Sequence, residues 1–155
     1  MTYQIELLSG KILVFNKEKL FLKNILSSIV FYGTGTIYNH KNIKLLKYYI
    51  FTFIFIYIIK IIENKSNLDI KIINHKSWNY KIKINENIYE IKYKFFSFMK
   101  NCCIILRNNI EIGYVYRELG ILPRKMSVEF LNDDKKIQYE ALISLLINLT
   151  NDEDV

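Results

Sequence analysis

The sequence is poor in the residues on which most catalytic, metal-binding and disulfide-stabilised proteins depend. It has one proline, five glycines, two cysteines and two histidines in 155 residues. So little proline and glycine excludes collagen-like structure and long disordered segments. Cys102 and Cys103 are adjacent, and neighbours on a strand point to opposite faces, so we expect no disulfide between them. No spacing of histidine and cysteine suits a metal ion, and we predict neither a metal nor a cofactor.

Residues for catalysis are equally scarce. Nucleophilic catalysis needs a positioned base, and His40 and His75 each lie between an asparagine and a lysine in expected turns. Gly33-Thr34-Gly35 lacks the remaining residues of a phosphate-binding loop and is predicted to be a flexible connection. We therefore expect no enzyme activity, no small-molecule substrate and no nucleic-acid partner. The first fifteen residues lack the features of a secretory signal, which predicts a cytoplasmic protein.

What the sequence has in abundance are isoleucine, tyrosine and phenylalanine, which favour strands over helices. Turn signals, each an asparagine followed by a large aliphatic residue, recur at intervals of 25, 20 and 22 residues: Asn42-Ile43, Asn67-Leu68, Asn87-Ile88 and Asn109-Ile110. Asparagine tolerates the left-handed backbone conformation that tight turns require. Weaker signals lie at residues 16–19 and 132–135. Six hairpins predict about twelve strands.

The apolar segment 45–62 permits a second interpretation, a membrane anchor. Lys47 and Lys60 enclose twelve uncharged residues, fewer than the roughly 20 that a spanning helix needs. Residues 37–53 also match residues 82–98 at seven of 17 positions, and the second copy continues into a segment that cannot span a membrane. The repeat therefore favours strands, and the anchored small membrane protein stays an alternative.

Residues 138–149 form a dense apolar block that predicts one helix, which must be buried because it is apolar nearly all round. The predicted fold is mainly β: a single domain over residues 1–150, an antiparallel hairpin-repeat barrel of about twelve strands around this hydrophobic helix. We expect the barrel to close and leave no exposed edge. Residues 151–155 form an acidic tail.

Charge is divided unevenly along the chain. Residues 129–155 carry a net charge of −5, which leaves +12 on residues 1–128 of the total of +7. Alternation places Lys81 and Lys83 on one strand face, and Lys92 and Lys94 on the facing strand of the same hairpin. These lysines are candidates for binding an anionic headgroup. A solvated outer face predicts the same spacing.

Two further candidates concern a membrane surface. Trp78, the only tryptophan, lies beside lysines and is a candidate interfacial anchor, or a core residue next to a hairpin. Cys102 and Cys103 follow an aromatic and basic stretch and are candidates for acylation, or one packs in the core and the other is exposed.

The stretches YEIKYKFFSFMKNCCIILRNNIEIGYVYR (residues 89–117) and MSVEFLNDDKKIQYEALISLLINL (residues 126–149) carry a family resemblance. Strands in hairpin order before a hydrophobic C-terminal helix resemble the tubby C-terminal-like superfamily, which includes phospholipid scramblases and LURP-one-related proteins. The resemblance covers about residues 36–150. It implies a non-enzymatic binding or scaffold module, frequently membrane-associated, and agrees with phosphoinositide binding through basic strand residues. The chain lacks the calcium-binding motif and the proline-rich extension of scramblases, so lipid scrambling is not implied.

The leading functional hypothesis is a binding or scaffold module that associates with anionic membrane lipid, or with a protein partner, through a basic outer surface. It would be peripheral at the cytoplasmic face of a membrane. A small immunity-type or inhibitor protein that acts through one protein interface is the alternative from a different class.

Overall fold

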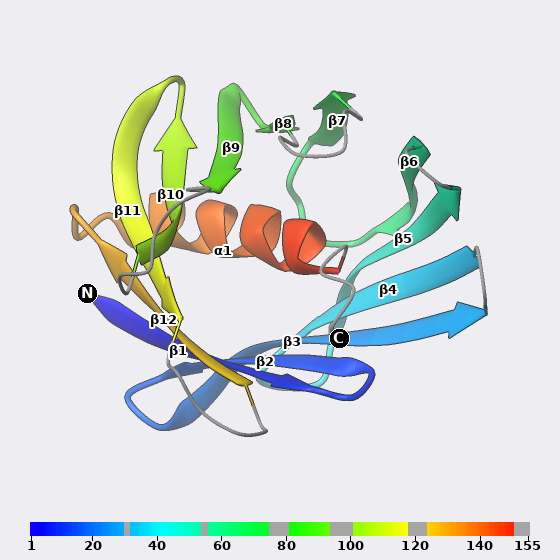
Figure 1. Ribbon diagram of the computed structural model, residues 1–155, viewed down its shortest axis with the longest axis horizontal. Helices are drawn as coiled ribbons and strands as arrows, with labels where there is room; N and C mark the ends of the chain where they lie inside the picture. Colours follow the sequence, from blue (N-terminus) through cyan, green and yellow to red (C-terminus); the bar gives the residue numbers. More distant parts are fainter. Residues whose placement is uncertain (30–31, 54–55, 75–80, 94–100, 118–123, 151–155) are drawn as a thin grey trace.

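The computed structural model describes residues 1–29, 32–53, 56–74, 81–93, 101–117 and 124–150. Within them, twelve strands form one antiparallel sheet that curls into a nearly closed barrel around a single helix (Figure 1), so the predicted fold class is confirmed. The strands are β1 (Thr2–Leu8), β2 (Lys11–Asn16), β3 (Lys19–Ile29), β4 (Tyr32–Asn39), β5 (Lys44–Phe53), β6 (Ile56–Asn64), β7 (Ile70–Asn74), β8 (Lys81–Ile84), β9 (Asn87–Tyr93), β10 (Asn101–Arg107), β11 (Ile110–Arg117) and β12 (Arg124–Phe130); the helix is α1 (Lys135–Leu149).

The strand order is β6-β5-β4-β3-β2-β1-β12-β11-β10-β9-β8-β7. Strands that are consecutive in the chain pair with each other, apart from β6 and β7, and β1 pairs in addition with β12, with Ile5 opposite Met126. Strands β6 and β7 are the two edges of the sheet, and no strand pairing joins their described residues. The expectation of a fully closed barrel is therefore wrong, because one seam stays open between two strands that are consecutive in the chain.

The apolar segment 45–62 lies in β5 and β6, apart from residues 54–55, as the internal repeat predicts. Tyr48 and Ile50 face Ile61 and Ile59 across the inner side of the pair, whereas Tyr49 and Lys60 form an outward pair. No helix within the described residues is both long enough and apolar enough to cross a membrane.

The glycines of β4 correct a prediction, because residues 33–35 belong to a regular strand and not to a flexible connection. Gly35 lies directly opposite Tyr48 on β5. A Cβ atom at Gly35 would lie 2.2 Å from Cζ of Tyr48, so the ring occupies the space that a side chain would need. Close packing therefore explains the glycine at this position.

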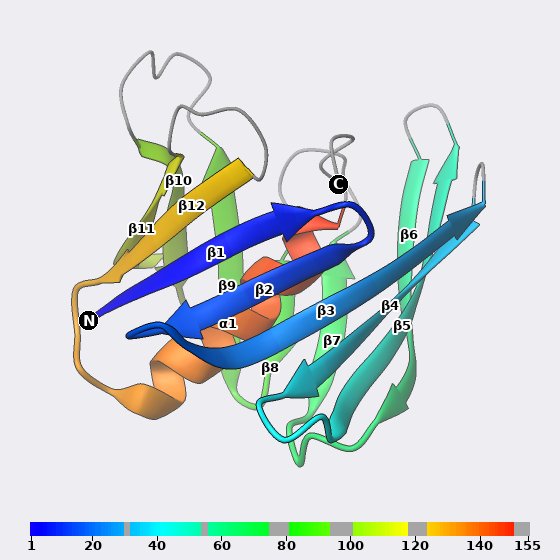
Figure 2. The ribbon, with the colours of Figure 1, turned by 90° about the horizontal axis from the view of Figure 1, so that it is seen from below.

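Helix α1 fills the barrel (Figure 2) and begins at Lys135, three residues before the predicted start. Asp134 is its N-cap, and its carboxylate accepts hydrogen bonds from the backbone N–H groups of Lys136 and Ile137. Every residue from Glu140 to Leu149 is buried. A helix surrounded by strands has no solvent face, which explains why its apolar residues follow no stripe.

The asparagine turn signals all lie at one end of the barrel. We call this the basal end and define it by the turns at residues 17–18, 40–43, 65–69, 85–86 and 108–109, together with the 131–134 connection to α1. Asn42, Asn67, Asn85, Asn108 and Asn109 there adopt positive φ, which asparagine tolerates. The sixth signal is not a hairpin, because Asn132 belongs to the connection between β12 and the helix.

Candidate anion-binding surface

The lysines predicted from strand alternation do lie together on the outer face of β8 and β9. Lys81 and Lys83 flank the buried Ile82, and Lys92 extends outward from β9. Lys71 on β7, directly opposite Lys83, joins them. Lys94 and Trp78 lie outside the described residues.

Acidic side chains neutralise most of this strand face. Lys81 lies 3.2 Å from the buried carboxylate of Glu90, Lys83 lies 3.7 Å from Glu86, and Lys71 lies 3.2 Å from Asp69. Among the described residues, only Lys92 of these four lysines has no ion pair. The strand face is thus poorly suited to hold an anion.

The two cysteines differ in what the structure describes. Cys103 lies on β10, where its side chain is 1% exposed and packs in the core, an environment that does not suit acylation. The backbone of Cys102 lies on β10 as well, but its side chain is outside the described part of the structure.

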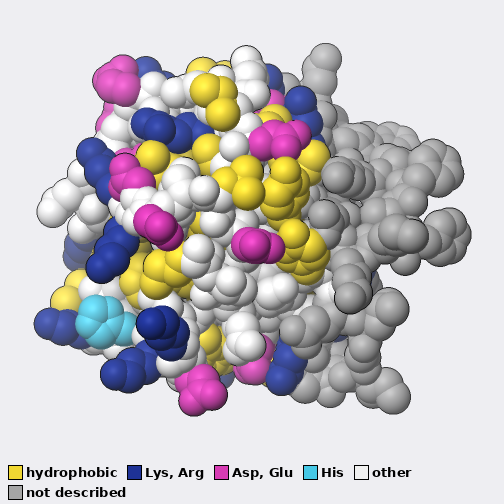
Figure 3. Space-filling view, turned by 90° about the vertical axis from the view of Figure 1, so that its left-hand side faces the viewer, with side chains coloured by type: hydrophobic (Ala, Val, Ile, Leu, Met, Phe, Trp, Pro, Cys, Tyr) yellow, Lys and Arg dark blue, Asp and Glu magenta, His cyan; other side chains and the backbone are white. Residues whose placement is uncertain are grey.

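Lysines without acidic partners gather instead at the basal end. Five exposed lysines there form no ion pair within the described chain: Lys17, Lys19, Lys41, Lys135 and Lys136. We call them the basal lysines. They come from the β2–β3 turn, the first residue of β3, the β4–β5 turn and the first turn of α1. Figure 3 shows basic side chains around the one described histidine, His40, with hydrophobic side chains beside them.

Exposed aliphatic side chains accompany these lysines. Four lie at or next to the basal connections: Ile43 is 56% exposed, Ile88 39%, Ile110 68% and Leu131 58%. Three of them are the aliphatic residues of the asparagine turn signals. The signals occur at every second connection of an antiparallel meander, so the sequence contained the information that they share one end.

A groove of about 580 Å³ opens at the basal end between α1 and the strands β1 to β4. Its buried and half-buried lining is largely apolar: Met1, Tyr3, Phe21, Leu22 and Tyr139. Exposed cationic or titratable side chains form its rim: His40, Lys135 and Lys136. Asn16 and Asn39 complete the lining, which contains no acidic residue in the part of the chain described.

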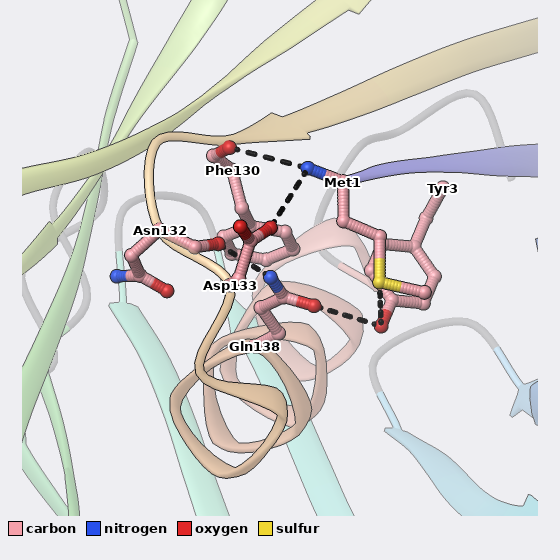
Figure 4. A network of polar contacts seen from close by, with 6 residues as sticks. All are labelled: Met1, Tyr3, Phe130, Asn132, Asp133 and Gln138. Atoms are coloured by element: carbon pink, nitrogen blue, oxygen red, sulfur yellow. Dashed lines mark hydrogen bonds and ion pairs between the residues drawn. The ribbon is translucent and has the colours of Figure 1, made fainter.

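A polar network holds one wall of this groove in place (Figure 4). The hydroxyl of Tyr3 donates to Oε1 of the buried Gln138 at 3.1 Å, and Nε2 of Gln138 donates to the carbonyl oxygen of Asn132 at 2.6 Å. The N-terminal amine of Met1 reaches the carbonyl oxygen of Phe130 at 3.5 Å and lies 3.9 Å from Asp133. These bonds connect β1, β12 and the start of α1, so the groove has a fixed wall.

The buried acid of the helix has a structural role. The Glu140 carboxylate accepts hydrogen bonds from the hydroxyl of Tyr89 at 2.7 Å and from the amides of Asn85 at 2.8 Å and Asn87 at 3.5 Å. Burial is the larger cause, and the Glu140 carboxylate the smaller one, that raise the pKa of Tyr89. The Tyr89 hydroxyl therefore keeps its proton and donates the hydrogen bond. The network ties α1 to the β8–β9 turn.

No cluster of histidine, cysteine and acidic residues suited to a metal ion occurs among the described residues. Comparisons with protein-family models, with curated proteins and with solved structures give no match.

Proposed function

We propose that the protein is a non-enzymatic binding module whose basal end docks on an anionic membrane surface. The observation that carries this proposal is the coincidence, at one end of the barrel, of five lysines without acidic partners and four exposed aliphatic side chains. Resemblance to the tubby C-terminal-like superfamily supports the same class of function and stays a prediction.

The two kinds of side chain suit the two layers of a membrane surface. A lysine near an anionic leaflet contributes about 1 kcal/mol of binding free energy. Isolated turns that carry isoleucine or leucine can place these side chains at the boundary between headgroups and acyl chains, where burial of apolar surface adds to the attraction. The strand face around Lys83 lacks this combination because three of its four described lysines are paired with acids.

Flotation with liposomes tests the proposal. The basal variant replaces four basal lysines by glutamine, and the control variant makes the same change in charge on the outer strands. The basal variant carries Lys17→Gln, Lys41→Gln, Lys135→Gln and Lys136→Gln; the control carries Lys11→Gln, Lys47→Gln, Lys60→Gln and Lys92→Gln. Lys81 stays in both variants because it neutralises the buried Glu90.

We expect the wild-type protein to float with vesicles that contain phosphatidylserine and not with neutral vesicles. The basal variant should bind at least about 100-fold more weakly, because four lysines contribute about 1 kcal/mol each. The control should retain most of the binding. Loss of binding in the control alone would show that the membrane-binding surface lies on the outer strands and not at the basal end. Failure of the wild type to bind anionic vesicles would contradict the membrane proposal.

A protein partner is the competing possibility, since exposed aliphatic residues with a basic rim also suit a protein interface. The immunity-type or inhibitor hypothesis would be favoured by two results together. The wild-type protein would bind neither type of vesicle, and it would pull down one acidic protein only when the basal lysines are intact.

A further inference from the structure

We propose that the basal groove binds one single-chain amphipathic anion, a long-chain carboxylate, with its chain against the aromatic floor and its head group toward the cationic rim. The inference deepens the proposed function and rests on the same basal end. It concerns a ligand that enters the groove singly, whereas membrane docking concerns the surface around the groove.

The floor of the groove supplies an apolar contact surface with a defined shape. The ring centroids of Tyr3 and Phe21 lie 5.5 Å apart. Those of Phe21 and Tyr139 lie 6.1 Å apart, with an angle of 85° between the ring planes. Tyr3 and Leu22 are almost fully buried, and Phe21 and Tyr139 are half-buried. Apolar side chains that line an opening to solvent gain stability when an alkyl chain covers them.

The rim supplies positive potential without a competing carboxylate. Lys135 and Lys136 lie in the first turn of α1, where the helix dipole is also positive. The two acids that directly precede the helix have partners of their own: Asp134 caps the helix, and Asp133 lies 3.9 Å from the N-terminal amine. Neither of these acids lines the groove.

Tyr139, which lines the groove, adds a hydrogen-bond donor. Its hydroxyl has no hydrogen-bond partner among the described residues, although the ring lines the groove. Burial raises the pKa of Tyr139, so the hydroxyl keeps its proton and can donate to an anionic oxygen.

The dimensions and polarity of the groove favour one chain over bulkier anions. Ligand pockets range from about 300 to 1,000 Å³, and 580 Å³ lies within that range. A nucleotide would place a polar base and ribose on a floor of tyrosine, phenylalanine and leucine. A single alkyl chain matches this floor, and one head group matches a rim of two lysines and a histidine.

Titration calorimetry with three soluble probes tests the inference on the full chain. Dodecanoate below its micellar concentration carries both chain and charge, dodecyltrimethylammonium carries the chain with the opposite charge, and acetate carries the charge alone. We expect saturable binding of dodecanoate with one site, and binding at least about tenfold weaker for each of the other probes. Amide chemical shifts in a ¹H–¹⁵N spectrum should move at residues 16, 21–22, 39–40 and 135–139.

Variants then assign the site. Lys135→Gln with Lys136→Gln, and separately Tyr139→Phe, should each weaken dodecanoate binding about tenfold, because each removes a donor to a charged oxygen. Lys60→Gln with Lys92→Gln changes the net charge equally and should leave the affinity unchanged. Tyr139→Phe removes a single oxygen atom, so it tests the site even if the lysine variant folds poorly.

Three results would overturn the inference: no saturable dodecanoate binding, equal affinity for the ammonium probe, or shifts confined to residues outside the groove. These outcomes are separate from those of the vesicle test. Binding of dodecanoate in the groove without binding to anionic vesicles would support the ligand site and contradict the membrane proposal. Binding to anionic vesicles without binding of dodecanoate would support the membrane proposal and contradict the ligand site.

Discussion

Substitution of Gly35 by alanine should destabilise the protein severely, although the change adds one methyl group. The new Cβ would lie 2.2 Å from Cζ, 2.3 Å from the hydroxyl oxygen and 2.6 Å from Cε2 of Tyr48, whereas ordinary contacts begin at 3.4 Å. The Tyr48 ring must therefore move by more than about 1 Å inside a core where it is fully buried.

The cost has two parts. Overpacking of a close-packed core costs about 2 kcal/mol. Movement of the ring also breaks the 2.6 Å hydrogen bond from Nδ2 of Asn24 to the Tyr48 hydroxyl. The buried amide then keeps only its 3.4 Å bond to the carbonyl oxygen of Leu146, and its unsatisfied hydrogen costs about 2 kcal/mol more. The expected loss of about 4 kcal/mol is a large share of the 5–15 kcal/mol that stabilises a typical domain.

Urea denaturation followed by circular dichroism measures this loss as a lower midpoint at constant slope. Thr34→Ala, an outward change on the same strand, should cost less than about 1 kcal/mol. In a Tyr48→Leu background, which lacks the three clashing atoms, Gly35→Ala should also cost less than about 1 kcal/mol. An unchanged loss of about 4 kcal/mol in that background would show that the tyrosine ring is not the cause.

Three further predictions concern turns and charges. Bonds from two lysines hold the pKa of Glu63 at about 2, below its usual 4.5, so Glu63 contributes stability above pH 4.5 that is lost as the pH falls to about 2. The difference in unfolding free energy between wild type and Glu63→Gln should therefore shrink over that range in acid titrations, and a constant difference would contradict the ion pairs. Glu18 has a φ of 66°, so Glu18→Gly should raise the free energy of unfolding by about 1 kcal/mol and therefore raise the urea midpoint, and a fall would argue against strain there. Glu140→Ala leaves three donors unsatisfied and should cost about 3 kcal/mol in the same assay, whereas Glu140→Gln, which retains an acceptor, should cost less than half of that.

The strand count and the burial of the helix could be predicted because both follow from local chemistry. Asparagine turns and runs of β-branched and aromatic residues are visible in the sequence without knowledge of any contact. The predicted start of α1 lies three residues too late because Lys135, Lys136 and Ile137 precede the apolar block. The N-cap Asp134 was a usable signal for the true start.

The binding surface was harder to predict because it depends on which segments meet. Alternation correctly indicates that Lys81 and Lys83 share a face. However, Glu90 pairs with Lys81 from the facing strand, and Asp69 in the β6–β7 loop pairs with the neighbouring Lys71, so both acids reduce the positive potential of this face. The seam between β6 and β7 likewise depends on the curvature of the whole sheet. No local pattern reports how far twelve strands bend.

The order of the strands has a consequence for how the chain can be divided. The first and last strands meet in the middle of the sheet, whereas the middle of the chain forms both of its edges. A cut in the 65–69 loop would therefore divide the chain into two six-stranded fragments, β1–β6 and β7–β12. It would not separate any two consecutive strands that pair with each other, because no pairing joins the described residues of β6 and β7. The fragment with α1 would carry the apolar axis of the barrel, and the other would wrap around it through β1 and β12. Two co-expressed halves of this protein should thus assemble into one barrel, as complementing fragments.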